Sequence, residues 1–255
     1  MTSARETAAA DNAAIAMFSR LDTKTIALLL DVDGTIIDIA STPHDVHVPL
    51  SLCRTLERLF RRMGGALALV SGRPVADLDR LFSPLKLPSI GGHGAETRLA
   101  DEHFSAAPLP APLRQRLAAA EKIGPGIVVE NKIYSLALHY RNAPEREDQL
   151  RRYIAEARSA FPGEATEVLP GRAVFEVKRP GISKGEAVRA LMQHAPFRGR
   201  QPIFIGDDVT DESVFAILPE LGGTGFSVQR EFDHISGIFH SPEQVRLALE
   251  ALADR

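Results

Sequence analysis

The sequence predicts an α/β protein: a Rossmann-like core built on a parallel sheet, with an inserted α+β cap domain of ββαββ pattern. Short, continuous apolar runs alternate with amphipathic helical stretches, which is the pattern of βαβ units around a parallel sheet. Two Pro-rich segments in the middle of the chain enclose a stretch in which strand pairs alternate with a helix. We therefore expect a tail over 1–22, a core over 23–105 and 180–255, and a cap over 106–179.

Four apolar runs predict the buried strands of the core, at 26–30, 66–70, 88–90 and 202–205. Most of these runs lead into an Asp, Ser or Gly residue, as strands do where they enter loops at the carboxyl edge of a parallel sheet. Amphipathic helices fit between them, at 49–63, from Pro74 onward, at 183–194 and at 210–218. Polar side chains from several strands should therefore meet at one edge of the sheet.

The inserted segment lies between the Pro-rich hinges 106–112 and 178–181. Its expected elements are two strand pairs and one helix, at 127–130, 133–141, 146–161, 164–169 and 173–178. In the second strand the residues alternate, so one face should pack on the cap helix while the other stays small and polar. The first face carries Tyr134, Leu136, Leu138 and Tyr140, and the second carries Ser135, Ala137, His139 and Arg141.

Composition narrows the class of protein. The 255 residues include 30 Lys and Arg against 33 Asp and Glu, a net charge of −3, which is not the basic excess of a nucleic-acid binder. The single Cys53 allows neither an intrachain disulfide nor a Cys-rich metal site, which favours a cytoplasmic setting. No apolar run reaches the about 18 residues of a membrane span, and residues 1–20 do not resemble a signal peptide. We expect a monomer with a small-molecule partner, no nucleic acid and no membrane.

Two acid-rich segments directly follow predicted strands. The segment Asp31-Val32-Asp33-Gly34-Thr35 places two carboxylates on the same side of extended chain, and their repulsion implies a metal or a catalytic dyad. An Asx-turn that merely closes the strand is the alternative. The segment 206–212 (GDDVTDE) repeats the arrangement. The acid-rich start of a helix would explain Asp211 and Glu212 but not Asp207, which we expect to join Asp31 and Asp33 in a site for Mg²⁺.

Two further segments have features that favour binding of an anion. In Ser71-Gly72-Arg73-Pro74 a strand end meets a helix start, where backbone N–H groups and a hydroxyl form an anion seat. A simple N-cap at Ser71 is the alternative. Lys184 opens another predicted helix, where the helix dipole disfavours a cation, so an anionic partner is expected. Together the four segments indicate metal-assisted phosphoryl transfer.

The order Asp-x-Asp-Gly-Thr, Ser, Lys and Asp-Asp resembles the haloacid dehalogenase (HAD) phosphohydrolase superfamily, and the inserted α/β cap resembles its sugar-phosphatase branch. The strings 91–96 (GGHGAE) and 206–212, together with Glu130-Asn131-Lys132 and His139-Tyr140-Arg141, are similar to the trehalose-6-phosphate phosphatase family. The similarity extends over residues 24–250. It implies Mg²⁺-dependent hydrolysis of trehalose 6-phosphate through an aspartyl-phosphate.

The resemblance also implies roles for individual residues. Asp31 is the expected nucleophile and Asp33 the general acid and base, with Lys184 and Ser71 as further catalytic residues. Mg²⁺ would be held by Asp31, Asp207 and the backbone carbonyl of Asp33, while Asp208 and Asp211 orient metal-bound water and Lys184. The expected substrate-binding residues are Asp31, Val32, Asp33, Thr35, Ser71, Gly72, Arg73, His93, Glu130, Lys132, Arg141 and Glu176.

Several other functions fit parts of the pattern. A HAD phosphatase for sucrose 6-phosphate or mannosylglycerate phosphate would differ only in its cap, and a phosphomutase would share all four segments. A non-catalytic phosphosugar sensor is a non-enzyme alternative, which the intact Asp31, Asp33, Lys184 and Asp207 disfavour. A receiver-type signalling domain also pairs acids with Lys, but it is shorter and lacks the Asp-x-Asp-Gly-Thr segment.

Overall fold

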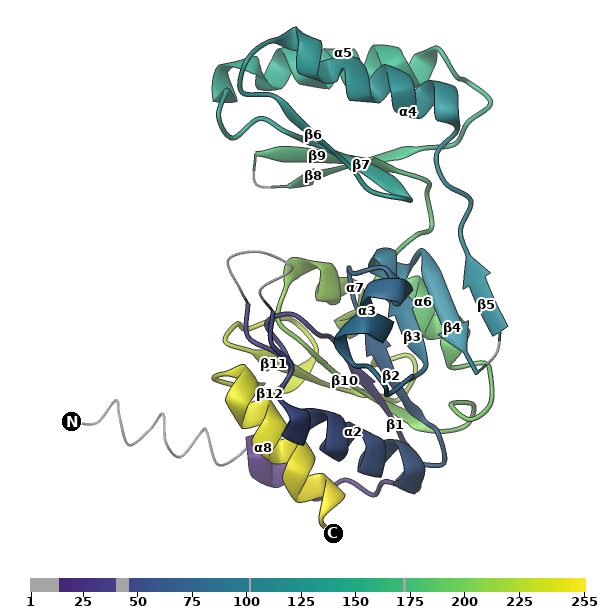
Figure 1. The fold of residues 1–255 in the computed structure, drawn as a ribbon, viewed down its shortest axis with the longest axis vertical. Coiled ribbons are helices and arrows are strands. Elements are labelled where there is room, and N and C mark those ends of the chain that lie inside the picture. The colour runs from purple at the N-terminus through teal and green to yellow at the C-terminus, as the bar shows by residue number, and fades with distance from the viewer. Residues whose placement is uncertain (1–13, 40–45, 101, 172) are drawn as a thin grey trace, which may run out of the picture. The chain divides into compact units, whose positions relative to one another are not determined.

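The computed structural model describes residues 14–39, 46–100, 102–171 and 173–255. The chain separates into two compact units, one made of 1–105 with 183–255 and the other of 106–182 (Figure 1). Among the described residues, no helix is both long and apolar enough to cross a membrane.

The first unit is organised around an eight-stranded sheet of order β12-β11-β10-β1-β2-β3-β4-β5. Six strands pair in parallel: β1 (Ile26–Leu30), β2 (Leu67–Val70), β3 (Ser89–Gly91), β10 (Gln201–Gly206), β11 (Thr224–Val228) and β12 (Ile235–Phe239). The strands β4 (Glu96–Leu99) and β5 (Glu102–Ser105) add an antiparallel edge. The predicted α/β class, a parallel core with a separate antiparallel insert, is confirmed.

The central strand β1 shows why the core strands could be recognised. All five of its residues are buried, because both faces of the sheet are covered by helices and each side chain must therefore be apolar. The helices of this unit include α2 (Leu50–Arg62), α3 (Val75–Leu81), α6 (Lys184–Leu191), α7 (Glu212–Phe215) and α8 (Pro242–Ala253), and residues 14–18 are helical as well. The crossovers from β1 to β2 and from β10 to β11 run in opposite directions, so right-handed connections place α2 and α7 on opposite faces. On these faces α2 packs against α8, and α6 against α7.

Three expectations for the first unit need correction. The helix expected over 210–218 is a 3₁₀ turn (Val209–Asp211) followed by the single turn of α7. The strands β4, β5, β11 and β12 were not expected, because their sequences are polar or interrupted by Gly rather than continuously apolar. Phe18, within the expected tail, is fully buried and lies edge-on to Phe226 and Phe239, so this end of the tail belongs to the core.

The second unit holds a four-stranded antiparallel sheet of order β6-β7-β9-β8. Its described residues also form two α-helices, which Figure 1 labels α4 and α5. The strands are β6 (Val128–Asn131), β7 (Ser135–His139), β8 (Glu167–Gly171) and β9 (Val174–Lys178), and the second helix is α5 (Glu147–Ser159). The first helix, α4 (Ala111–Ala118), was not expected. It begins inside the segment interpreted as a hinge, since Pro is compatible with the first turn of a helix. The unit is therefore αββαββ rather than ββαββ.

The alternation in β7 divides its side chains between two faces. Leu136, Leu138 and Tyr140 are buried in the core of this unit, together with Leu150 and Ile154 of α5. The Tyr140 ring also stacks on Phe175, with ring centroids 5.1 Å apart. The opposite face of the strand carries Ser135, Ala137 and His139.

Candidate active site

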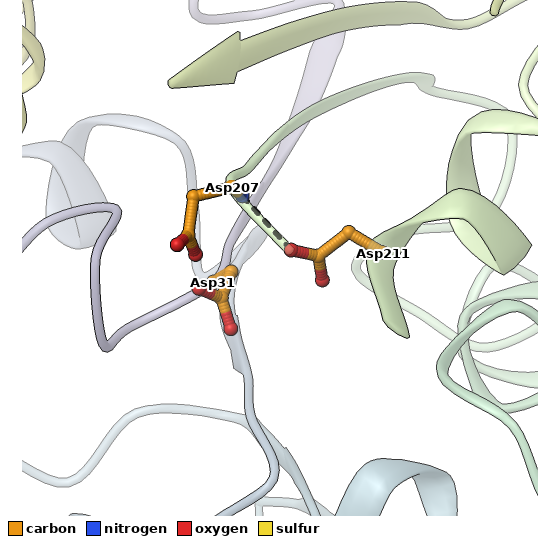
Figure 2. Close-up of side chains that lie close together, drawn as sticks. All are labelled: Asp31, Asp207 and Asp211. Carbon is orange, nitrogen blue, oxygen red and sulfur yellow. Dashed lines mark hydrogen bonds between the residues drawn. The ribbon is translucent and has the colours of Figure 1, made fainter. Parts of the chain in front are cut away.

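The site is built where two neighbouring strands end. Asp31 follows β1 and Asp207 follows β10, and the register that pairs Leu30 with Ile205 brings both residues to the same edge of the sheet. Asp211 lies one turn further along the chain. Carboxylate oxygens of the three acids lie within 4.8 Å of one another (Figure 2). We refer to Asp31, Asp207 and Asp211 as the acid cluster.

Lys184, the first residue of α6, neutralises part of this charge. Its Nζ lies 2.7 Å from Asp31 Oδ1 and 2.7 Å from Asp211 Oδ1, and only 3% of its side chain is exposed. Burial works against the charged ammonium, but Asp31 and Asp211 outweigh that effect and raise the pKa of Lys184 above its ordinary value. The anionic partners expected for this cation are thus, within the protein itself, two carboxylates.

The acid cluster carries more negative charge than Lys184 can balance. Burial, and next the charge of Asp31, raise the pKa of Asp207 to about 7, and the same two causes raise the pKa of Asp211 to about 7. The Thr35 hydroxyl lies 2.9 Å from Asp31 Oδ2 and 3.2 Å from Asp207 Oδ1, and links the two acids. A bound cation would stabilise the ionised form of all three carboxylates.

The residues present fit a hard divalent cation. Carboxylate oxygens are the donors that such ions prefer, and those of Asp31 and Asp207 come together here, with Asp211 beside them. Gly34 allows the Asp207 carboxylate to lie against the backbone: its φ of +82° suits glycine, and a Cβ there would lie 2.2 Å from Asp207 Oδ2. The chain therefore has the ligands for a metal next to Asp31.

Asp211 and Asp208 differ in their surroundings. Both carboxylate oxygens of Asp211 are engaged, Oδ1 by Lys184 and Oδ2 by the backbone N–H groups of Asp207 and Asp208, at 2.9 and 3.0 Å. Asp211 therefore holds both Lys184 and the loop that carries Asp207. The Asp208 side chain is 59% exposed, lies 3.7 Å from Arg230, and does not belong to the acid cluster.

Asp33 lies beside the acid cluster in the sequence, but in the structure it is paired with Arg73. The guanidinium donates from Nε to Asp33 Oδ2 and from Nη2 to Asp33 Oδ1, each at 2.6 Å, in the fork geometry typical of strong Arg–carboxylate pairs. The hydrogen bond to Asp33 raises the pKa of Arg73, more than burial lowers it. Arg73, which was expected to bind substrate, therefore holds another expected site residue in this structure.

The loop between β2 and α3 is held by several close contacts. The buried Ser71 accepts a hydrogen bond at Oγ from the N–H of Arg73, at 3.1 Å, and so caps its own turn rather than α3. A Cβ on Gly72 would lie 2.4 Å from the imidazole of His93, which places His93 directly against this loop. The N–H of Val75 at the start of α3 donates to Glu96 Oε2 at 2.8 Å.

Glu96 was not among the expected site residues. A lone acid at the end of the Gly-rich string 91–96 is the signal that the sequence offered, and the structure shows this carboxylate buried, where it needs donors. Val32 needs a correction of the opposite kind. The whole residue is buried in the core and exposes no surface to a substrate.

The remaining expected residues belong to the second unit. Glu176 Oε1 accepts the Ser135 hydroxyl at 2.6 Å and lies 3.6 Å from Lys132 Nζ. Glu130 Oε2 lies 3.2 Å from His139 Nε2. Arg141 is exposed and follows the end of β7. The structure thus brings Glu176 and Lys132 together, whereas Arg141 has no such neighbour among the contacts of the described residues.

Comparison with known proteins places this chain in a family. Residues 29–250 match the family model described as trehalose-phosphatase. A protein of Sinorhizobium fredii (strain NBRC 101917 / NGR234) named "Probable trehalose-phosphate phosphatase" is 38% identical over 258 residues, covering 99% of this chain and 96% of that protein. The trehalose-6-phosphate phosphatase of Escherichia coli (strain K12) is 40% identical over 206 residues, covering 79% of this chain and 77% of that protein.

Solved structures agree on the fold. The C-terminal domain of a Candida albicans trehalose-6-phosphate phosphatase superposes with a TM-score of 0.73 at 21% identity, covering 96% of this chain and 97% of that one. An Aspergillus fumigatus trehalose-6-phosphate phosphatase superposes with a TM-score of 0.70 at 23% identity, again covering 96% of this chain and 97% of the other. With the acid cluster, Lys184 and the family match taken together, the chain belongs to the trehalose-phosphatase family of phosphoric monoester hydrolases.

Proposed function

We propose that this protein hydrolyses trehalose 6-phosphate to trehalose and phosphate, with Asp31 as the nucleophile. The observation that carries the proposal is how the Asp31 carboxylate is held. It is buried beside Asp207, its Oδ1 accepts a hydrogen bond from Lys184, and its Oδ2 accepts one from the Thr35 hydroxyl. A carboxylate fixed in this way, with part of its charge neutralised, can approach a phosphate monoester. The names of the relatives support the choice of substrate.

The metal in this proposal is Mg²⁺. Asp31, Asp207 and the backbone carbonyl of Asp33 would hold it, and Asp208 and Asp211 would orient its surroundings. Once bound, Mg²⁺ would supply positive charge against the phosphate oxygens and the acid cluster. The oxygen donor set and the raised pKa of Asp207, about 7, support a cation at this position.

The protein's own groups carry the two chemical steps. Asp31 attacks the phosphorus, and an aspartyl-phosphate forms as the bond to the sugar oxygen breaks. Lys184, Ser71 and the backbone N–H groups near Gly72 hold the phosphate oxygens, whose charge must be stabilised for this slow reaction. A water molecule then releases phosphate and restores the Asp31 carboxylate.

Asp33 is the proposed general acid and base. It gives a proton to the departing sugar oxygen and then takes one from the attacking water. The Arg73 guanidinium holds the Asp33 carboxyl group in a fixed orientation. A protonated Asp33 no longer offers charge to Arg73, and we propose that Arg73 then binds the substrate phosphate.

Recognition of the sugar is assigned to polar residues of the second unit. A disaccharide offers hydroxyl groups without charge, and carboxylates, ammonium groups and backbone amides are suitable partners. We propose that residues 106–179 form a cap whose Glu130, Lys132, Arg141 and Glu176 bind these hydroxyls. Gly72 and His93 of the core are the further proposed substrate-binding residues, whereas Val32 and Thr35 are fully buried. We also propose that the protein acts as a cytoplasmic monomer in trehalose biosynthesis, without nucleic acid or membrane.

One assay tests the proposed function. Phosphate release is measured from trehalose 6-phosphate, sucrose 6-phosphate and mannose 6-phosphate, with Mg²⁺ or with EDTA. We expect trehalose 6-phosphate to be the preferred substrate, with activity that EDTA abolishes and that Asp31→Asn removes. Preference for sucrose 6-phosphate would favour the alternative phosphatase. Binding of trehalose 6-phosphate without phosphate release would favour a sensor.

A further inference from the structure

The strand β7 supplies a hydrogen-bonding side chain to an acid on each of its two neighbours. Ser135 donates its hydroxyl to Glu176 Oε1 on β9 at 2.6 Å, and His139 Nε2 lies 3.2 Å from Glu130 Oε2 on β6. Ser135 and His139 lie four residues apart in the strand and therefore share a face. Ala137 lies between them and pairs in register with both Glu130 and Glu176.

The Ser135 contact is a diagonal one. The residue directly opposite Ser135 on β9 is Lys178 rather than Glu176. Lys178 is occupied elsewhere, because its Nζ donates to the Ile182 carbonyl and lies 3.2 Å from Glu167. The Ser135 hydroxyl therefore serves Glu176, whose side chain is 26% exposed and accessible to a ligand. Lys132 approaches the same oxygen from 3.6 Å.

Resting on the proposed function, we propose that Ser135 is a positioning residue that fixes the Glu176 carboxylate for recognition of the sugar part of the substrate. A flexible Glu side chain loses rotamer freedom when it binds a hydroxyl, and a carboxylate held in place beforehand has already lost it. Ser135 is itself buried and cannot contact the sugar directly. Its effect must therefore pass through Glu176.

A serine with only a structural role would, when replaced, change the stability of the protein rather than its binding of the sugar. Ser135→Ala removes a hydroxyl together with its need for a partner, and leaves Glu176 able to bind water, so the unfolding free energy should change little. Sugar binding, by contrast, should lose the effect of one hydrogen bond to a charged acceptor. We expect KM for trehalose 6-phosphate to rise about tenfold with kcat changed less. Ser135→Thr keeps the hydroxyl and should recover most of the wild-type KM.

The decisive experiment is a double-mutant cycle with Ser135→Ala and Glu176→Ala. Steady-state kinetics are measured on trehalose 6-phosphate and on p-nitrophenyl phosphate, an ester without a sugar, so that the ratio of the two kcat/KM values corrects for inactive protein. We expect Ser135→Ala to lower this ratio about tenfold in the wild type but less than about twofold in the Glu176→Ala background. Ser159→Ala, on the exposed side of α5, is the matched control and should leave the ratio unchanged.

The outcomes separate the two proposals. Equal effects of Ser135→Ala with and without Glu176, or a loss of thermal stability with no change in the ratio, would overturn the positioning role while the proposed function stands. A wild type that hydrolyses another sugar phosphate but not trehalose 6-phosphate would overturn the proposed substrate. The cycle is then run on the substrate that is hydrolysed, where additivity again decides against Ser135.

Discussion

The acid cluster makes Mg²⁺ binding depend on pH in a defined way. Asp207 has an ordinary pKa of 3.8 that burial, and next Asp31, raise to about 7 in the folded protein. Mg²⁺ must displace this proton, so the apparent affinity should fall about tenfold for each pH unit below about 7 and level off above it. Between pH 8 and pH 6 we expect the apparent Kd to rise about tenfold.

Isothermal titration calorimetry of the protein with MgCl₂ at several pH values measures this change. Protons should be released on binding below pH 7, which titrations in buffers of different ionisation enthalpy detect. Asp254→Asn, which removes a surface acid paired with Arg58, should keep the same dependence, whereas Asp207→Asn should lose measurable binding. An affinity that is the same at pH 6 and pH 8 would refute the assignment of Asp207 as a ligand.

The raised pKa of Asp207 also makes the stability of the folded protein depend on pH. Without metal, the folded protein keeps a proton on Asp207 between pH 4 and 7 that the unfolded chain has lost, so unfolding should become easier as pH rises through this range. Mg²⁺ binds only the folded, ionised site and should therefore raise Tm more at pH 8 than at pH 6. Thermal unfolding in EDTA and in MgCl₂ measures both effects, and an equal rise at the two pH values would contradict the argument.

Three substitutions test individual supports of the site. Lys184→Met leaves the Asp31 and Asp211 carboxylates without their cation and should lower the unfolding free energy in EDTA by about 3–5 kcal/mol, measured by urea titration. An unchanged unfolding free energy would show that Lys184 does not neutralise these two acids. Gly34→Ala forces a Cβ against Asp207 Oδ2 and should weaken Mg²⁺ binding at least about tenfold by calorimetry, whereas Gly163→Ala, with open space around it, should not. Glu96→Ala removes the acceptor of the Val75 N–H and should lower the unfolding free energy by about 1–3 kcal/mol in the same urea assay. Glu96→Gln keeps an acceptor and should be close to the wild type. Equal losses in the two variants would show that this hydrogen bond is not what Glu96 contributes.

The sequence predicted that Asp31 and Asp207 meet at one edge of the sheet because the strands before them are buried on both faces. An apolar run that ends in Asp31, Ser71 or Gly206 leaves little choice about where the next polar residue lies, since parallel strands bring their carboxyl ends together. The approach of Asp207 to Asp31 follows from this rule.

Contacts that depend on side-chain direction could not be predicted in the same way. The fork between Arg73 and Asp33 joins residues on separate loops, and the spacing of the motifs does not say whether Arg73 turns toward a carboxylate or a ligand. The strands β11 and β12 were missed because Gly225 and Gly237 interrupt their apolar pattern. Their backbones approach neighbours so closely that a Cβ would meet other atoms within 3.2 Å. Helix α4 was missed because Pro110 and Pro112 resemble a linker until the helix is seen to begin among them.

The central claim is that Asp31 becomes phosphorylated, and one measurement addresses it directly. Asp33→Asn is mixed with p-nitrophenyl phosphate, whose leaving group needs no proton, so the attack proceeds while the hydrolysis that needs Asp33 is slowed. After an acid quench, peptide mass spectrometry should find one phosphoryl group on Asp31, and none in the double variant Asp31→Asn with Asp33→Asn. Release of p-nitrophenol with Asp31 unmodified, or a phosphoryl group on another residue, would contradict the account.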